Sequence, residues 1–336
     1  MTTPLLLDIR DLSLQFRTRG GTVHALEDVT LAIARGETVG LVGESGSGKS
    51  VLSYAILGLS DAAARITRGS ARFDGLDLLA ASEHDLQAVR GREVSMIFQN
   101  PKVALNPIRK VGHQIEDVLA CHTTVRSHER RERAIACLAE MKIPDPARRY
   151  HAYPFELSGG LCQRIMIALA LACGPKLLIA DEPTTGLDVT TQAAIMRLIR
   201  EKASNAHDGR GMSTLLITHD LGLAREQCDR IVVMHAGHVV ESAPTETLFG
   251  SPQHPYTRQL IGATPVGRGA LADLNAIPGS LPDLRRADLP ACRFALRCEQ
   301  RSAACEAPLP VVKDGSHVVR CHRPGLVGAG APESSV

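Results

Sequence analysis

A glycine-rich stretch, GESGSGKS at residues 43–50, carries the residue types that bind phosphate groups. It matches the pattern G-x-x-x-x-G-K-S/T, follows the apolar stretch TVGLV and precedes a helical pattern, which is the context this pattern requires. Backbone N–H groups of such a loop point at negative charge, so we expect Lys49 to bind the β- and γ-phosphates of a nucleotide and Ser50 to bind Mg²⁺. The predicted phosphate-binding residues are Gly43, Ser45, Gly46, Ser47, Gly48, Lys49 and Ser50.

Two adjacent carboxylates, Asp181 and Glu182, follow the apolar run LLIA. In a phosphate-transfer site, the first would bind Mg²⁺, and the second would act as a general base on the attacking water. The bland alternative is a pair of surface acids at the end of a strand. The loop alone is equally compatible with a kinase or a GTPase, so the loop and the acid pair together indicate nucleotide chemistry without defining its class.

Four of the nine cysteines, Cys292, Cys298, Cys305 and Cys321, crowd into the last 45 residues with the spacing C-x5-C-x6-C-x15-C. Four thiolates suit either Zn²⁺ or an iron–sulfur cluster. The spacing lacks the C-x2-C pairs of zinc ribbons, and reduced thiols without a metal are a third interpretation. The surrounding segment is rich in proline and poor in apolar residues, so a cross-link is expected to order it.

The elements that position these residues alternate between strand and helix. Residues 1–40 contain alternating apolar positions typical of strands, and KLLIAD and TLLITHD are continuous apolar runs typical of buried strands. IVVMHAGHVVE predicts a hairpin with a turn at AGH. Residues 101–165 have amphipathic helical patterns, and the proline-rich texture after about residue 250 predicts loops. Such alternation indicates a covered, mostly parallel sheet.

Composition excludes several other classes of protein. The 336 residues are 44% hydrophobic and carry a formal net charge of +2, so neither a largely disordered chain nor a nucleic-acid binder is expected. Aromatic residues are only 3% and tryptophan is absent, which disfavours base stacking. The longest apolar run, near residues 165–173, is about half of the ~20 residues that a membrane span needs. With no secretory signal pattern at the start, we expect a cytosolic protein.

Further motifs give the chain a family resemblance. LSGGLCQR at residues 157–164 resembles the LSGGQ signature of the ATP-binding cassette (ABC) ATPases. The phosphate loop, Gln99 in FQNP, LSGG, LLIADE, GLD at 186–188 and His219 in THD occur in the order of that family, and the resemblance covers residues 1–250. It implies an α/β fold, namely a P-loop ABC ATPase core with an antiparallel β subdomain and a helical insertion at about 101–165.

The resemblance also implies roles for single residues. Gln99 would contact Mg²⁺ and the attacking water, and with Glu182 and His219 it would form the catalytic group. The signature residues Ser158, Gly159, Gly160 and Gln163 would act on the ATP of a partner subunit. Asp188 would contact that partner, and Phe16 would stack on adenine unless it is an ordinary core residue. Three positions depart from the family pattern, namely Leu161, Asn100 and Gly186, and none of them removes a catalytic group.

The segment SPQHPYTRQL at 251–260 resembles the region after the ATPase core in dipeptide and oligopeptide importers. In that family a similar cysteine set holds a 4Fe–4S cluster, which the resemblance implies for Cys292, Cys298, Cys305 and Cys321, with structural zinc as the alternative. We therefore expect an ATPase domain at 1–250, a C-terminal unit at 251–326 and a disordered tail at 327–336. No motif residue falls in the C-terminal unit, which favours a structural or sensing role for it.

The resemblance implies the ATP-hydrolysing subunit of a peptide importer, with ATP and Mg²⁺ bound. Its expected partners are a second ATPase chain in a heterodimer, two transmembrane permeases and an extracytoplasmic substrate-binding protein, but no nucleic acid. It would lie on the cytoplasmic face of the inner membrane, held by the permeases. Alternatives are the same motor for nickel or glutathione, a soluble ABC ATPase without a transport role, and an exporter half.

Overall fold

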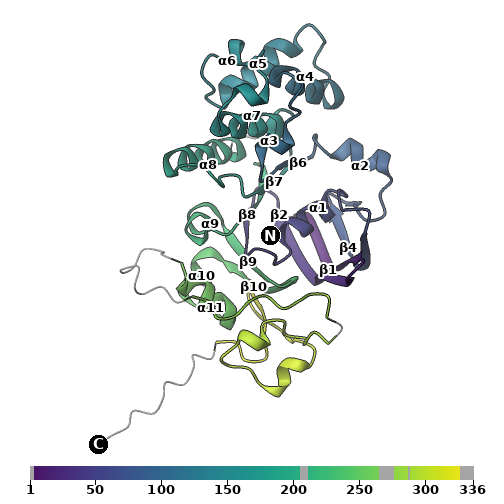
Figure 1. The fold of residues 1–336 in the computed structure, drawn as a ribbon, viewed down its shortest axis with the longest axis vertical. Coiled ribbons are helices and arrows are strands. Elements are labelled where there is room, and N and C mark those ends of the chain that lie inside the picture. The colour runs from purple at the N-terminus through teal and green to yellow at the C-terminus, as the bar shows by residue number, and fades with distance from the viewer. Residues whose placement is uncertain (1–3, 205–210, 265–275, 287, 326–336) are drawn as a thin grey trace, which may run out of the picture. The chain divides into compact units, whose positions relative to one another are not determined.

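The computed structural model describes residues 4–204, 211–264, 276–286 and 288–325 (Figure 1). The chain forms two compact units, each assembled from several stretches of sequence. Among the described residues, unit 1 comprises 4–7, 33–38, 73–204 and 211–217, and unit 2 comprises 8–32, 39–72, 218–264, 276–286 and 288–325. None of the described helices is long and apolar enough to cross a lipid bilayer.

Unit 1 is built on three parallel strands in the order β8-β7-β6. They are β6 (Val94–Ile97), β7 (Leu177–Asp181) and β8 (Ser213–Thr218), and every residue in them is buried. Strands that are buried throughout belong to a parallel sheet covered on both faces, as the continuous apolar runs predict. The central strand β7 ends at Asp181, so the predicted carboxylate pair lies at the C-terminal end of this strand.

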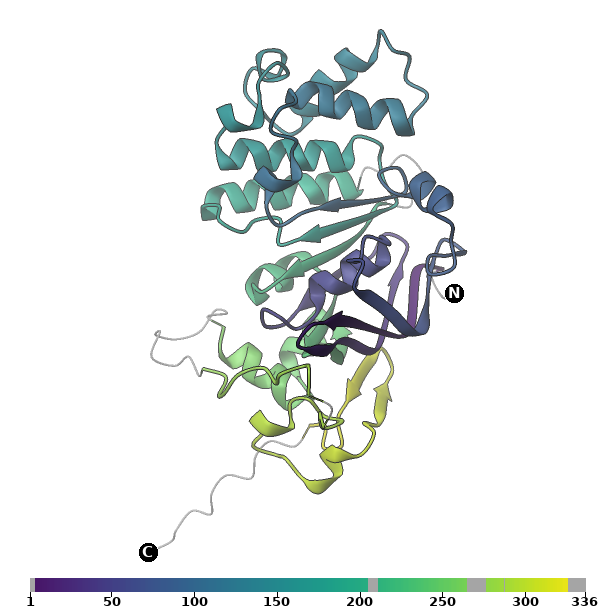
Figure 2. The ribbon, with the colours of Figure 1, turned by 45° about the vertical axis from the view of Figure 1, so that its right-hand side comes forward.

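The predicted helical insertion is confirmed within unit 1. Helix α7 (Gly159–Leu171) packs against α4 (Val111–His122), α5 (Arg130–Glu140) and the short α3 (Pro101–Ala104), and these helices lie together in both views (Figures 1 and 2). The apolar faces of α4, α5 and α7 are buried, as the amphipathic patterns predict. The remaining elements of unit 1 are β5 (Leu76–Asp77), α2 (Glu83–Val89), α6 (Pro146–Arg149), a 3-10 turn (Pro154–Glu156) and α8 (Val189–Ser204).

Unit 2 contains two groups of strands. One is a sheet in the order β2-β1-β4, formed by β1 (Leu5–Thr18), β2 (Gly21–Ala34) and β4 (Ala64–Phe73). In the other, β3 (Thr38–Val42) runs parallel to β9 (Arg230–His235), and β9 pairs antiparallel with β10 (His238–Pro244). Ala236 and Gly237, with φ of +48° and +85°, make the two-residue turn of this hairpin, which confirms the turn expected at AGH.

The C-terminal part of unit 2 is less irregular than its composition predicts. Strand β12 (His317–Arg320) pairs with β10 and with β11 (Val311–Asp314), so a hairpin extends the sheet. The other elements of this part are α9 (Leu221–Gln227), α10 (Thr245–Gly250), α11 (Pro255–Gly262) and two 3-10 turns (Ala295–Arg297 and Ala303–Glu306). The predicted tail at 327–336 lies outside the described residues.

Candidate nucleotide site

The phosphate loop in unit 2 follows β3 and leads into α1 (Lys49–Ile56). Two glycines are required by the backbone. Gly43 has φ +151°, and a Cβ placed on it would lie 2.1 Å from the carbonyl oxygen of Met234. Gly48 has φ +103°, caps α1 in the left-handed region, and would bring a Cβ within 2.9 Å of the Ala25 carbonyl oxygen. The loop is therefore shaped by packing on its neighbours as well as by its own turns.

Lys49 is buried, and its ammonium lies against the loop that precedes it. The Nζ atom donates hydrogen bonds to the carbonyl oxygens of Gly43 at 2.8 Å and Glu44 at 2.9 Å, and to Ser47 Oγ at 3.3 Å. A cation held by the backbone of the loop is positioned to meet an anion that the loop binds. Ser50 is half-buried in the first turn of α1, Ser45 and Gly46 are exposed, and Ser47 is fully buried.

The carboxylate pair lies in unit 1. Asp181 is buried at the end of β7, whereas the Glu182 side chain is only half-buried. Glu182 has φ +47°, a conformation that costs a non-glycine residue roughly 1–2 kcal/mol. Its N–H donates to the Ile217 carbonyl oxygen at 2.9 Å, which fixes the sharp turn that follows the strand. Backbone strain of this kind is found where a side chain must be aimed in a set direction.

Two donors orient the Glu182 carboxylate. Gln99 Nε2 lies 2.8 Å and Thr185 Oγ1 lies 2.9 Å from Glu182 Oε2. A carboxylate held by an amide and a hydroxyl on one oxygen keeps its second oxygen in a defined direction, as a general base requires. The family resemblance groups Gln99 with Glu182 but gives no role to Thr185, whose only signal in the sequence is its place three residues after Glu182.

The signature residues form the N-terminus of α7. Ser158 is the N-cap residue, and its Oγ accepts a hydrogen bond from the Leu161 N–H at 3.4 Å. Among the described residues, a Cβ on Gly159 would meet no atom within 4 Å, and one on Gly160 would meet only Thr191 at 3.9 Å. Packing within the described part of the chain therefore gives no reason for either glycine. An exposed helix N-terminus without side chains can accept a closely approaching anion.

The fourth predicted signature residue, Gln163, makes a contact within this chain. Its side chain is buried, and Nε2 donates to the carbonyl oxygen of Pro183. Helix α7 is buried on several sides, so the fourth residue after Gly159 turns inward rather than toward solvent. Gln163 therefore links α7 to the segment that follows Glu182, and its action on a partner's ATP stays a prediction.

The other predicted residues lie in simpler surroundings. Asp188 is exposed and accepts hydrogen bonds from the N–H and Oγ1 of Thr191, which hold the pKa of its carboxyl below the usual range. His219 is exposed directly after β8. Phe16 is half-buried on β1. The roles predicted for Asp188, His219 and Phe16 stay predictions.

The four C-terminal cysteines line one small cavity in unit 2, together with His254. Backbone N–H groups two residues further along donate to the sulfur atoms of three of them, from Phe294 to Cys292, from Gln300 to Cys298 and from Arg323 to Cys321. Burial raises the pKa of Cys292 to about 12. In the described part of the chain, however, no group of three or more His, Cys, Asp or Glu side chains is arranged to hold a metal ion.

His254 presents an unpartnered donor in the same surroundings. Its Nδ1 accepts a hydrogen bond from the Tyr256 N–H at 3.0 Å, and burial lowers its pKa to about 3. The neutral ring therefore carries its proton on Nε2. That atom is buried and has no hydrogen-bond partner among the described residues. A buried N–H without a partner costs free energy unless an acceptor occupies the space it faces.

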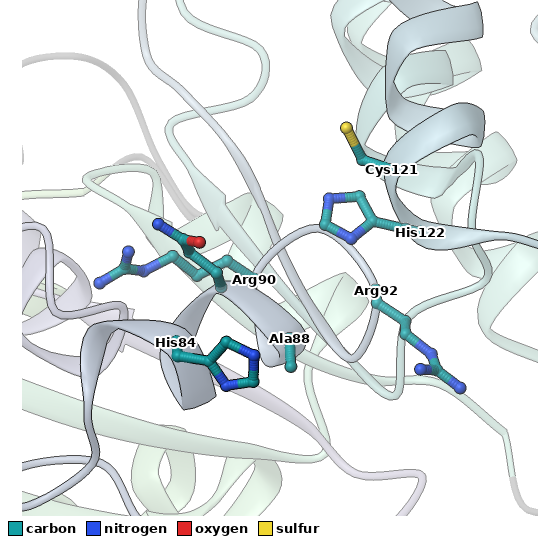
Figure 3. Close-up of a pocket in the computed structure, with 7 residues that line it drawn as sticks. His84, Ala88, Arg90, Arg92, Cys121 and His122 are labelled. Carbon is teal, nitrogen blue, oxygen red and sulfur yellow. The ribbon is translucent and has the colours of Figure 1, made fainter.

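A second pocket lies in unit 1 and contains none of the predicted site residues. Figure 3 shows it between the end of α4, which contributes Cys121 and His122, and the region of α2, which contributes His84 and Ala88. Arg90 also lines this pocket and forms an ion pair with Glu83 at 2.6 Å. Its cationic side chain is thus already paired, so we assign the pocket no ligand.

Comparison with protein families gives two matches. The ABC transporter family matches residues 26–185, and the family described as oligopeptide/dipeptide transporter, C-terminal region, matches residues 240–305. The first range includes the phosphate loop, the signature and the carboxylate pair. The second includes His254 and three of the four cysteines.

Curated relatives match nearly the whole chain. A putative peptide import ATP-binding protein of Brucella melitensis is 47% identical over 322 residues, with 96% of each chain covered. The probable D,D-dipeptide transport ATP-binding protein of Escherichia coli is 45% identical over 96% of each chain. The oligopeptide transport ATP-binding protein AppD of Bacillus subtilis is 43% identical over 94% of this chain and 96% of its own.

Among solved structures, a dimeric ATP-binding cassette bound to ADP and Pi in a post-hydrolysis state is similar, with a TM-score of 0.63 and 29% identity. The match covers 71% of this chain and 98% of that chain.

Proposed function

Because this chain belongs to the peptide import ATP-binding proteins of ABC transporters, we propose that it hydrolyses ATP to drive uptake of dipeptides or oligopeptides. The transported solute would pass through separate permease subunits. Relatives named for peptide import support this substrate class over the nickel and glutathione alternatives.

The observation that carries the proposal is the oriented carboxylate of Glu182. Gln99 and Thr185 donate hydrogen bonds to one of its oxygens, at 2.8 and 2.9 Å. Glu182 directly follows buried Asp181, which is the last residue of β7. We assign Glu182 the role of general base for the attacking water. Lys49 would bind the β- and γ-phosphates and His219 the γ-phosphate, while Phe16 would stack on adenine.

Mg²⁺ would be held by Ser50, Gln99 and Asp181, and it would neutralise charge on the phosphates. The donors suit this ion, because hydroxyl, amide and carboxylate oxygens are its usual protein ligands. Burial of Asp181 fits a carboxylate that faces a cation rather than solvent.

We further propose that Ser158, Gly159 and Gly160 act on the ATP of a second ATPase subunit. The absence of any packing reason for the two glycines supports this, since only a group from outside the chain would need the space. The dimeric state of the similar solved cassette agrees with such pairing. Asp188 would lie at the contact with the partner.

The remaining partners follow from the family. We propose a heterodimer of ATPase chains that docks on two permeases at the cytoplasmic face of the inner membrane, with an extracytoplasmic substrate-binding protein delivering the peptide.

Two substitutions in the assembled transporter test the hydrolytic site. Glu182→Gln keeps the shape of the side chain and removes the base, so ATP binding should persist while hydrolysis falls by about 10²-fold or more. Lys49→Ala should weaken nucleotide binding itself. Phosphate release and binding of a fluorescent ATP analogue separate the two effects. Hydrolysis by Glu182→Gln at the wild-type rate would exclude Glu182 as the base.

We also propose that the four cysteines bind a 4Fe–4S cluster, with zinc as the alternative. The support is the chemistry of the donors. Four thiols line one cavity, three of their sulfur atoms already accept backbone hydrogen bonds, and His254 Nε2 has an unused proton there. Because the thiol pKa of Cys292 is raised to about 12, this residue would need a bound cation to become a thiolate at neutral pH.

Metal and sulfide analysis of anaerobically purified protein tests the cysteine site. The proposal expects about four irons and four sulfides per chain, a broad visible absorption and loss of both in Cys305→Ser. One zinc and no iron would replace the cluster with a zinc site. No metal, together with four thiols that are alkylated in the native protein, would exclude both.

A further inference from the structure

The phosphate loop contains a carboxylate that the predicted chemistry does not use. Glu44 follows Gly43 directly, in a loop whose task is to bind polyphosphate. A carboxylate near phosphate groups repels them unless a cation compensates its charge. The structure provides that cation from a residue more than 250 positions away.

Arg297 binds Glu44 through both guanidinium NH₂ groups, at 2.6 and 2.8 Å. The Arg297 side chain is only 4% exposed and that of Glu44 is 28% exposed. The Nε atom of Arg297 donates to the Pro278 carbonyl oxygen at 2.7 Å, and another N–H lies 3.2 Å from His235 Nε2. The guanidinium is buried, it contacts the carboxylate through two nitrogen atoms, and it also donates to other acceptors. The geometry of the Arg297–Glu44 contact is therefore fixed.

The backbone of Glu44 is held from the same side. Its N–H donates to the Tyr256 hydroxyl oxygen at 3.0 Å. Tyr256 is fully buried in α11, and its ring packs edge-on against His235 with centroids 4.6 Å apart. Phe294 completes this aromatic cluster, 5.2 Å from His235. The C-terminal segments therefore fix residue 44 at two points, its amide and its carboxylate.

The position of Glu44 bears directly on Lys49. The Lys49 ammonium donates to the carbonyl oxygens of Gly43 and Glu44, at 2.8 and 2.9 Å. A shift of residue 44 would therefore move the acceptors that hold the ammonium. Leu281 lies beside the same loop, since a Cβ on Gly46 would be 3.3 Å from its Cδ1.

We propose that Arg297 is a positioning residue for nucleotide binding: it neutralises Glu44 and holds the phosphate loop in the shape that places Lys49. This inference rests on the proposed assignment of residues 43–50 as the phosphate loop. It also gives the C-terminal segment a part in the nucleotide site, in addition to carrying the cysteines.

The test measures the affinity of the full-length chain for a fluorescent ATP analogue with Mg²⁺. Arg297→Ala should raise Kd about tenfold, because the unpaired Glu44 carboxylate repels phosphate and the loop loses its anchor. Glu44→Gln should raise Kd by less than Arg297→Ala does, because its amide oxygen can still accept from Arg297 and a neutral side chain does not repel phosphate. The double variant Arg297→Ala/Glu44→Gln should bind more tightly than Arg297→Ala, because it regains the part of the affinity that repulsion by the unpaired Glu44 carboxylate costs.

Two further variants separate this role from general stability. Arg301 lies on the same segment, is half-exposed and pairs with Glu306 at 3.0 Å, so Arg301→Ala is the matched control and should leave Kd unchanged. Arg297→Lys keeps the charge without the two-pronged contact and should fall between wild type and alanine. Arg297→Lys also replaces Arg297→Ala in the test if the alanine variant does not fold.

Lys49→Ala distinguishes the two levels of the argument. If it abolishes binding while Arg297→Ala and Arg297→Lys both bind like wild type, the role of Arg297 is excluded and the phosphate loop stands. If Lys49→Ala binds the ATP analogue with wild-type affinity, residues 43–50 are not the phosphate loop, and the proposed role of Arg297 is excluded as well. Weak binding by Arg297→Ala that Glu44→Gln fails to restore would contradict neutralisation of Glu44.

Discussion

At the scale of single residues, the site depends on charges whose partners are already in place. Glu182 is oriented by Gln99 and Thr185, and Glu44 is paired with Arg297. The imidazole of His235 differs from these charged groups, because it is fully buried beside the Arg297 guanidinium. Burial first, and the charge of Arg297 second, lower its pKa to about 3, so the folded chain keeps it neutral.

The buried His235 predicts an acid-sensitive fold in unit 2. Its folded pKa lies below the unfolded value of 6.5, so as the pH falls through 6.5 only the unfolded chain gains a proton. Its stabilising effect is therefore complete above pH ~6.5 and is lost progressively below, by about 2 kcal/mol between pH 7 and pH 5. His235→Gln retains an acceptor for Arg297 without titrating. Its urea unfolding free energy should drop less over this range than that of wild type, and equal drops would contradict the assignment.

At the scale of elements, helix termini and strand ends carry the chemistry. Helix α1 begins at the phosphate loop, α7 begins at the signature, and β7 ends at the carboxylate pair. These placements were predictable, because each depends on a local pattern that sets the start or the end of one element. The inward direction of Gln163 was not, because it depends on how α7 packs within unit 1.

The open space at the N-terminus of α7 leads to a prediction for Gly159. A Cβ there meets no atom of the described residues within 4 Å, so Gly159→Asp should fold as stably as wild type, with a melting temperature within about 2 °C. Its negative charge should repel the γ-phosphate of a partner's ATP and lower ATPase activity of the assembled transporter at least tenfold. Gly262→Ser, in similarly open space, is the control. Full activity of Gly159→Asp would exclude the signature from acting on ATP.

At the scale of the whole molecule, the sequence suggests a C-terminal unit separate from the ATPase core, whereas the structure joins its segments to the phosphate loop. Arg297 and Tyr256 both contact Glu44, more than 200 residues earlier in the chain. No local pattern could reveal these contacts, since they depend on how distant segments of unit 2 fold together. The domain boundary at residue 250 stays a prediction.

Peptide uptake into proteoliposomes measures whether ATP hydrolysis by this chain drives transport. The vesicles would contain both ATPase chains and both permeases, with binding protein and labelled dipeptide on one side and ATP on the ATPase side. The account predicts ATP-dependent accumulation by wild type, and none above the ATP-free level by the complex carrying Glu182→Gln, although that complex still binds ATP. Accumulation by the Glu182→Gln complex at the wild-type rate, or none by a wild-type complex that hydrolyses ATP with peptide present, would contradict it.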